Sequence, residues 1–132
     1  MSKENVELVK RAVACVNQRD IDGYLACCTE DVQLITPTAE VAGAYDGPEG
    51  IRRFFADIAD ASPDFKIVIE SLEAVGPDRV MGFMSVIGTG RASGIPIENP
   101  TGNVYDFADA RIQRIRIFFD RNQALEAAGL SE

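Results

Sequence analysis

The side chains available for chemistry in this chain are few, because its 132 residues include no histidine. Histidine is the side chain that most often transfers protons near neutral pH and binds metal ions. Acid–base chemistry would therefore depend on carboxylates, lysine, tyrosine or cysteine. The cysteines, Cys15, Cys27 and Cys28, form no CxxC pair, so the composition favours small buried thiols over a zinc site or a Cys–His nucleophile. We expect no metal and no cofactor.

Two carboxylates are the candidates for a proton-transfer group. Asp120 follows the last predicted strand, but Asp120 and Gln123 also have the spacing of a helix N-cap pair, and we favour the cap. Glu98 lies near a strand bulge that we expect around Pro100, which leaves the direction of its side chain open. Strand alternation places Asp106 on the outer face of the sheet, where we expect its side chain to be solvated.

Composition and charge exclude several classes of protein. With 46% hydrophobic and 26% charged residues, the chain is typical of one globular domain spanning residues 1–132. Its net charge of −8 argues against binding to nucleic acid or to an anionic membrane surface. No apolar run approaches the roughly 18 residues of a membrane span, and the first residues do not resemble an export signal. We therefore predict a cytoplasmic protein.

Helices are predicted mainly in the first half of the chain. From Ser2, a possible N-cap, to about Arg19, valines recur on one face of a helix. Asp20 can cap a second, shorter helix that reaches Cys28. The stretch 45–50 opens a third helix that ends before Pro63, and its predicted apolar stripe consists of Ile51, Phe54, Phe55 and Ile58.

That third helix carries two further signals. Asp46 and Glu49 have capping-box spacing, and Pro48 suits the first turn. Arg52, Arg53 and Asp57 are predicted to face solvent.

Strands dominate the second half. Extended segments are predicted at 32–36, 65–75, 80–90, 95–107 and 111–119, with a tight connection at 108–110. A last helix begins at Asp120 and ends at Gly129 in a Schellman-type stop. Helices followed by an antiparallel sheet indicate an α+β domain with its helices on one sheet face.

Several segments resemble the SnoaL-like proteins. These segments are residues 16–22, Asp31-Val32 with Pro37, residues 45–55, and residues 118–121 with Ala124-Leu125. The family is part of the superfamily of nuclear-transport-factor-2-like and ketosteroid-isomerase-like domains, and the resemblance extends from about residue 5 to 130. It implies a cystatin-like cone, a strongly bent antiparallel sheet with N-terminal helices on its concave face. It also implies an apolar pocket and a homodimer formed through the sheet.

Strand alternation predicts which residues face the cone. Ile115, Ile117 and Phe119 would lie inside, and Arg114 and Arg116 on the face left for solvent or a dimer partner. Phe119→Ala would then cost about 3–5 kcal/mol if the ring were fully buried. The family pattern adds inward residues from other elements. The predicted binding set is Asn103, Tyr105, Phe119, Ile117, Val16, Phe54 and Thr36.

The sequence departs from the catalytic members of the superfamily. The resemblance places Thr36 where ketosteroid isomerases have their aspartate base, and Ala12 and Asn103 where they have oxyanion-hole donors. Neither threonine nor asparagine can serve as the acid–base group. We therefore predict a small-molecule-binding protein in which Asn103 and Tyr105 fix a small apolar organic ligand. The alternative is a cyclase, isomerase or epoxide-hydrolase-like enzyme that uses Asp120 or Glu98 as its proton-transfer group. An epoxide-hydrolase-like enzyme would also need an arginine between the two carboxylates, Arg91 or Arg111.

Overall fold

The structure, a computed structural model, describes residues 2–37 and 44–130. The predicted loop 38–44 lies outside the described residues apart from Ala44, as does the side chain of Ser2. The helices are α1 (Ser2–Asn17), α2 (Ile21–Ala26), α4 (Gly47–Ala61) and α5 (Arg121–Ala128). The strands are β1 (Cys28–Ile35), β2 (Tyr45–Asp46), β3 (Lys66–Ala74), β4 (Arg79–Thr89), β5 (Pro96–Ala108) and β6 (Arg111–Phe118).

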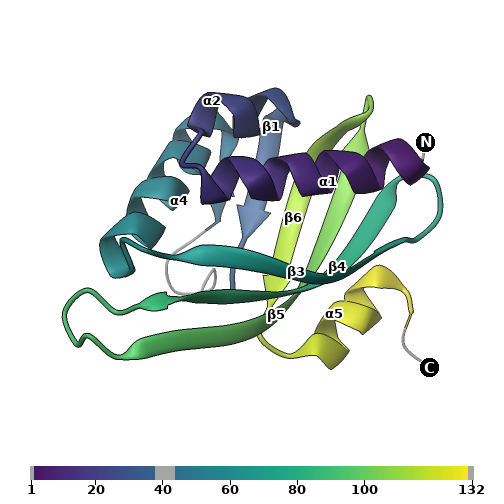
Figure 1. Ribbon diagram of the computed structural model, residues 1–132. Helices are drawn as coiled ribbons and strands as arrows, with labels where there is room; N and C mark the ends of the chain where they lie inside the picture. Colours follow the sequence, from purple (N-terminus) through teal and green to yellow (C-terminus); the bar gives the residue numbers. More distant parts are fainter. Residues whose placement is uncertain (1, 38–43, 131–132) are drawn as a thin grey trace.

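The strands form one sheet in the order β2-β1-β6-β5-β4-β3 (Figure 1). Strands β3 to β6 pair as antiparallel neighbours, whereas β1 pairs with β6 in parallel. The expectation of a wholly antiparallel sheet is wrong at this one pairing. Hairpins fix the relative direction of consecutive strands only, and β1 and β6 are far apart in the sequence. Strand β1 also begins earlier than predicted, at Cys28, which pairs with Ile112.

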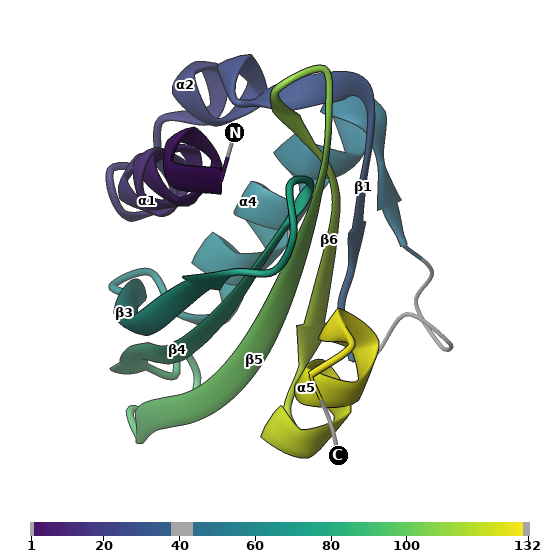
Figure 2. The same cartoon turned by 90° about the vertical axis from the view of Figure 1, so that its right-hand side faces the viewer.

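Figure 2 shows that the sheet is strongly bent and that α1, α2 and α4 lie within its curve. This arrangement confirms the predicted α+β cone with its N-terminal helices on the concave face. The helices bury their apolar stripes against the sheet, and Ile51, Phe54 and Phe55 of α4 are all buried. The ring of Phe55 meets Tyr24 of α2 edge to face, with ring centroids 5.4 Å apart, a favoured geometry for aromatic pairs.

The C-terminal end of α1 is tied to strand β3 at the edge of the sheet. The side chain of Asn17 accepts the Ile67 amide proton at 2.7 Å and donates to the Ile67 carbonyl at 2.9 Å, as a neighbouring strand would. Arg19 places its guanidinium 3.8 Å from the centroid of the Phe65 ring. These contacts satisfy an exposed strand edge and hold α1 over the sheet.

The predicted helix caps are confirmed for α2 and α5 but not for α4. Asp20 Oδ1 accepts a hydrogen bond from the Gly23 amide at 2.9 Å. Helix α5 ends at Gly129, whose φ of +83° is left-handed, as a Schellman stop requires. Asp46 makes no side-chain cap bond, because it belongs to β2 and instead accepts a hydrogen bond from Gln33.

Helix α5 packs on the convex face (Figure 2), contrary to the expectation that all helices lie on one side. Outward-facing apolar residues explain its position, since Met81 and Val104 form a second buried cluster with Ala124 and Ala128 of α5. A Cβ atom on Gly102 would lie 2.4 Å from the Cβ of Ala124, so the missing side chain allows the close approach of α5.

The expected bulge around Pro100 is also wrong. The register of β4 with β5 runs without interruption from Arg79–Asp106 to Thr89–Pro96. Register shifts occur instead between Ile69 and Ser71 in β3 and between Asp106 and Phe107 in β5. None of the described helices is long and apolar enough to cross a membrane.

Candidate functional site

A hollow of about 400 Å³ lies on the concave face, between α4 and the β4, β5 and β6 strands. Most of its wall is apolar. The lining residues are Thr36, Pro37, Tyr45, Phe54, Asp57, Ile58, Ala61, Ser62, Phe65, Val86, Ile87, Ile97, Asn99, Thr101, Ile117 and Phe119. A concave site with apolar walls and a few polar groups is typical of small-molecule pockets, and this volume lies within their usual range.

Part of the predicted binding set lines this hollow. Phe54, Thr36, Ile117 and Phe119 are all lining residues. The side chain of Phe119 is nevertheless 60% exposed, so it lies at the rim and not in the core. The large stability loss expected for Phe119→Ala required a buried ring and does not apply.

Asn103 and Tyr105 lie on the same strand face but are not among the lining residues. Both are buried, and both point at Met84, whose sulfur accepts from the Asn103 amide at 3.4 Å and lies 3.9 Å from the Tyr105 hydroxyl. Burial raises the pKa of Tyr105 to about 12, although the nearby Asn103 amide acts against this. Neither side chain reaches the hollow in this structure.

The buried Asn103 amide is incompletely satisfied, because its Oδ1 atom accepts no hydrogen bond from the described residues. Leaving a buried acceptor without a partner costs free energy. Val16, also in the predicted set, is 3% exposed within the core between α1 and the sheet and does not line the hollow.

One polar pair that lines the hollow was not predicted from the sequence. The hydroxyl of Tyr45 donates a 2.6 Å hydrogen bond to Oδ2 of Asp57. Asp57 was predicted to face solvent, and it is exposed, but it stands at the rim of the hollow. Tyr45 belongs to strand β2, which places it beside this helix. Strand β2 has two residues, which are too few for a hydrophobic period to be recognised in the sequence.

The two predicted proton-transfer candidates do not line this hollow, although Asp120 lines an adjoining one that shares Thr36, Pro37, Ile117 and Phe119 with it. Asp120 is exposed, and its Oδ1 accepts from the Asn122 amide at 2.8 Å, which is the cap geometry. Glu98 is exposed on β5. Neither is among the residues that line the hollow. Arg91 is engaged with the Asp60 carbonyl oxygen at 2.8 Å, and Arg111 is exposed at the start of β6.

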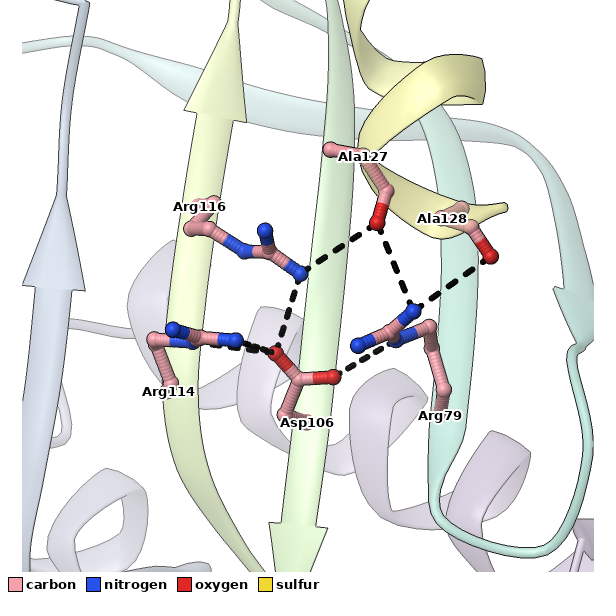
Figure 3. A network of polar contacts seen from close by, with 6 residues as sticks. All are labelled: Arg79, Asp106, Arg114, Arg116, Ala127 and Ala128. Atoms are coloured by element: carbon pink, nitrogen blue, oxygen red, sulfur yellow. Dashed lines mark hydrogen bonds and ion pairs between the residues drawn. The ribbon is translucent and has the colours of Figure 1, made fainter. Parts of the chain in front are cut away.

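The convex face carries an ion-pair network (Figure 3). Asp106 is only 16% exposed and is not solvated as predicted. It lies 2.7 Å from Arg79, 2.9 Å from Arg114 and 3.1 Å from Arg116. Burial alone would raise the pKa of Asp106, but hydrogen bonds from Arg79 and Arg114 outweigh it, so the pKa is lowered. Strand alternation predicted that Asp106, Arg114 and Arg116 face outward, but it could not show that the Asp106 side chain contacts both of these arginines and Arg79.

The same arginines bind the C-terminal end of α5. Arg79 donates to the carbonyl oxygens of Ala127 and Ala128 at 3.4 and 3.5 Å, and Arg116 donates to Ala127 at 3.5 Å. Cations stabilise the carbonyl end of a helix. The network therefore fastens α5 to the sheet, which is a structural role.

The thiols are buried and unpaired, as the sequence predicts for Cys15, Cys27 and Cys28. Burial raises the pKa of the Cys28 thiol to about 12, so it is a poor nucleophile. Within residues 2–37 and 44–130, no three histidine, cysteine, aspartate or glutamate side chains are grouped so that they could hold a metal ion.

A bent sheet around a mostly apolar hollow, with helices on the concave face, defines a cystatin-like α+β cone. The chain belongs to the SnoaL-like domain family, whose model matches residues 9–115. Among curated proteins, none matches this sequence.

Solved structures share this fold. An uncharacterized cystatin-fold protein from Novosphingobium aromaticivorans is 24% identical over 89% of this chain and 98% of that one, with a TM-score of 0.75. A putative SnoaL-like polyketide cyclase from Jannaschia is 20% identical over 99% and 94%, with a TM-score of 0.78. A Mycobacterium tuberculosis protein in complex with estradiol-17beta-hemisuccinate is 18% identical over 89% and 94%, with a TM-score of 0.75.

Proposed function

We propose that this protein binds a small, largely apolar organic molecule in the concave hollow. The observation that carries the proposal is the hollow itself, about 400 Å³ in volume with mostly apolar walls. Apolar burial would supply most of the binding free energy, and the polar lining residues would orient the ligand. The complex of the Mycobacterium tuberculosis protein with estradiol-17beta-hemisuccinate supports the apolar part of this ligand, because the steroid ring system is largely apolar.

The alternative of an enzyme that uses Asp120 or Glu98 has less support. Asp120 serves as the cap of α5, and both side chains are exposed and do not line the concave hollow. A proton-transfer group gains a suitable pKa from a desolvated position beside its substrate. Both carboxylates are exposed to solvent, so neither is desolvated in this way.

Titration with the neutral dye N-phenyl-1-naphthylamine tests the binding proposal, since its fluorescence rises in an apolar site. Asn99 is exposed and lines the hollow, so Asn99→Trp should fill the hollow without disturbing the core. Glu98→Trp is the matched control, because Glu98 is the preceding residue on the opposite face of β5. We expect Asn99→Trp to weaken dye binding at least about tenfold and Glu98→Trp to leave it unchanged. Equal effects of both variants, or no binding to the parent protein, would refute the proposal.

A homodimer through the convex face is a further part of the proposal. Strands β1 and β6 present a polar surface there that includes Asp31, Gln33, Gln113 and Arg114, and side chains of both signs can pair across a two-fold axis. Sedimentation equilibrium should then give twice the chain mass, and a monomer at all concentrations would contradict it.

The proposed location is the cytoplasm. The described cysteines are free and buried, which suits a reducing compartment. Fractionation of cells that express the protein would test this location.

A further inference from the structure

The charged groups that line the described part of the hollow are all of one sign. Among the described lining residues, Asp57 is the single ionisable carboxylic acid, and none is an arginine or a lysine. The chain as a whole carries a net charge of −8. A ligand with its own negative charge would therefore meet repulsion at the rim and find no cation inside.

Tyr45 holds Asp57 in place. The hydroxyl of Tyr45 donates to its Oδ2 atom at 2.6 Å. The ring of Tyr45 is itself fixed by Phe54, edge to face at 5.5 Å, and by the Arg53 guanidinium, 4.9 Å from the ring centroid. The hydrogen bond to Asp57 raises the pKa of Tyr45, so the hydroxyl keeps its proton and continues to donate.

The second oxygen of Asp57 remains available. Oδ1 accepts no hydrogen bond from the part of the chain that the structure describes, and the nearby Arg53 donates instead to the Ala44 carbonyl at 3.4 Å. A carboxylate can accept several hydrogen bonds. Beside the apolar side chains of Phe54 and Ile58, a donor on a bound ligand would compete with water for this oxygen.

We propose that the hollow selects apolar molecules that carry a hydroxyl group, alcohols or phenols, and that the hydroxyl donates to Asp57. Carboxylic acids of the same size are rejected. This inference rests on the proposed function, because it assigns the polar end of a ligand held in the same hollow.

Three naphthalene derivatives of similar size distinguish the possibilities: 2-naphthol, 2-methylnaphthalene and 2-naphthoate. Their affinities are measured near pH 7 by displacement of N-phenyl-1-naphthylamine and by calorimetry. The methyl compound is more apolar than the alcohol, so burial alone predicts that it binds more tightly. We expect the reverse, with 2-naphthol about fivefold tighter than 2-methylnaphthalene and 2-naphthoate the weakest.

Asp57→Asn removes the charge at constant shape, and Asp60→Asn is the matched control. Asp60 is exposed on the same helix but does not line the hollow. Asp57→Asn should abolish the preference for 2-naphthol and strengthen binding of 2-naphthoate, whereas Asp60→Asn should change neither.

The possible failures are distinguishable. If 2-methylnaphthalene and the dye do not bind, the proposed function itself is wrong. If they bind but 2-naphthol is not preferred, only the assignment of ligand class is wrong. If the preference exists and survives Asp57→Asn, the hydroxyl binds another group and the role given to Asp57 is refuted.

Discussion

On the concave face of the sheet, polar side chains border an open hollow, whereas on the convex face they neutralise one another beneath a helix. Asp57 lies at the rim of the hollow, and its Oδ1 atom accepts no hydrogen bond from the described residues. Asp106, on the opposite face, is enclosed by Arg79, Arg114 and Arg116. Both are aspartates that the sequence assigns to solvent. Their different surroundings show that the availability of a carboxylate for a ligand depends on what its neighbours leave unpaired.

The largest expected effect compares two methionines of β4 that face opposite ways. Met84 is 0% exposed in the core of the concave face, and Met81 is 4% exposed against α5. Each change to alanine should lower the free energy of unfolding by about 3–4 kcal/mol, because it leaves a cavity. Only Met84→Ala should change the dye affinity, since Met84 packs in the core of the concave face and pairs across the sheet with Thr101, which lines the hollow. Urea denaturation and dye titration measure the two effects.

If Met81→Ala changed the dye affinity and Met84→Ala did not, the ligand would bind on the convex face, which contradicts this prediction.

A second prediction concerns Asp106→Asn, which removes the charge that balances the three arginines. We expect it to cost about 3 kcal/mol near pH 7, because breaking a largely buried pair leaves cations uncompensated. The pKa of Asp106 is lowered in the folded protein. Its stabilising contribution is therefore complete above the unfolded pKa and is lost as the pH falls through the folded pKa.

Chemical denaturation between about pH 2 and 7 tests this dependence. The parent protein should lose stability below about pH 4 more steeply than Asp106→Asn, and dye affinity near pH 7 should be the same for both. Parallel stability profiles would show that the network does not stabilise the fold.

The smallest stability effect is expected for Phe119→Ala, whose ring is 60% exposed. The free energy of unfolding should change by no more than about 0.5 kcal/mol, while dye affinity should fall about threefold because one apolar wall of the hollow is lost. Ile95→Ala is the control, since Ile95 is 64% exposed and does not line the hollow. A stability loss of several kcal/mol would mean that the ring is buried in solution.

Local patterns in the sequence were sufficient for most of the elements. The caps at Asp20 and Asp120 and the stop at Gly129 depend on neighbouring residues only, and the structure confirms them. Pairings between distant segments carry no such local signal. The parallel pairing of β1 with β6 and the position of α5 on the convex face therefore could not be predicted.

The same limit applies to the candidate site. Alternation correctly placed Ile117 and Phe119 toward the hollow, because facing has a period of two along a strand. Alternation could not show which part of the cone is filled by core side chains and which part is left open. Asn103 and Tyr105 were therefore expected to contact a ligand, whereas in the structure they contact Met84. The Tyr45–Asp57 pair depends on a contact between β2 and α4 that no motif marks.

The most direct test of the central claim is amide chemical-shift mapping during titration with N-phenyl-1-naphthylamine. If the ligand occupies the concave hollow, shifts should concentrate at Ile58, Thr101 and Ile117, which line it, and should be absent at Asp106 and Arg114. Shifts centred on the Asp106 network, or spread evenly over both faces, would contradict the assignment of the concave hollow as the binding site.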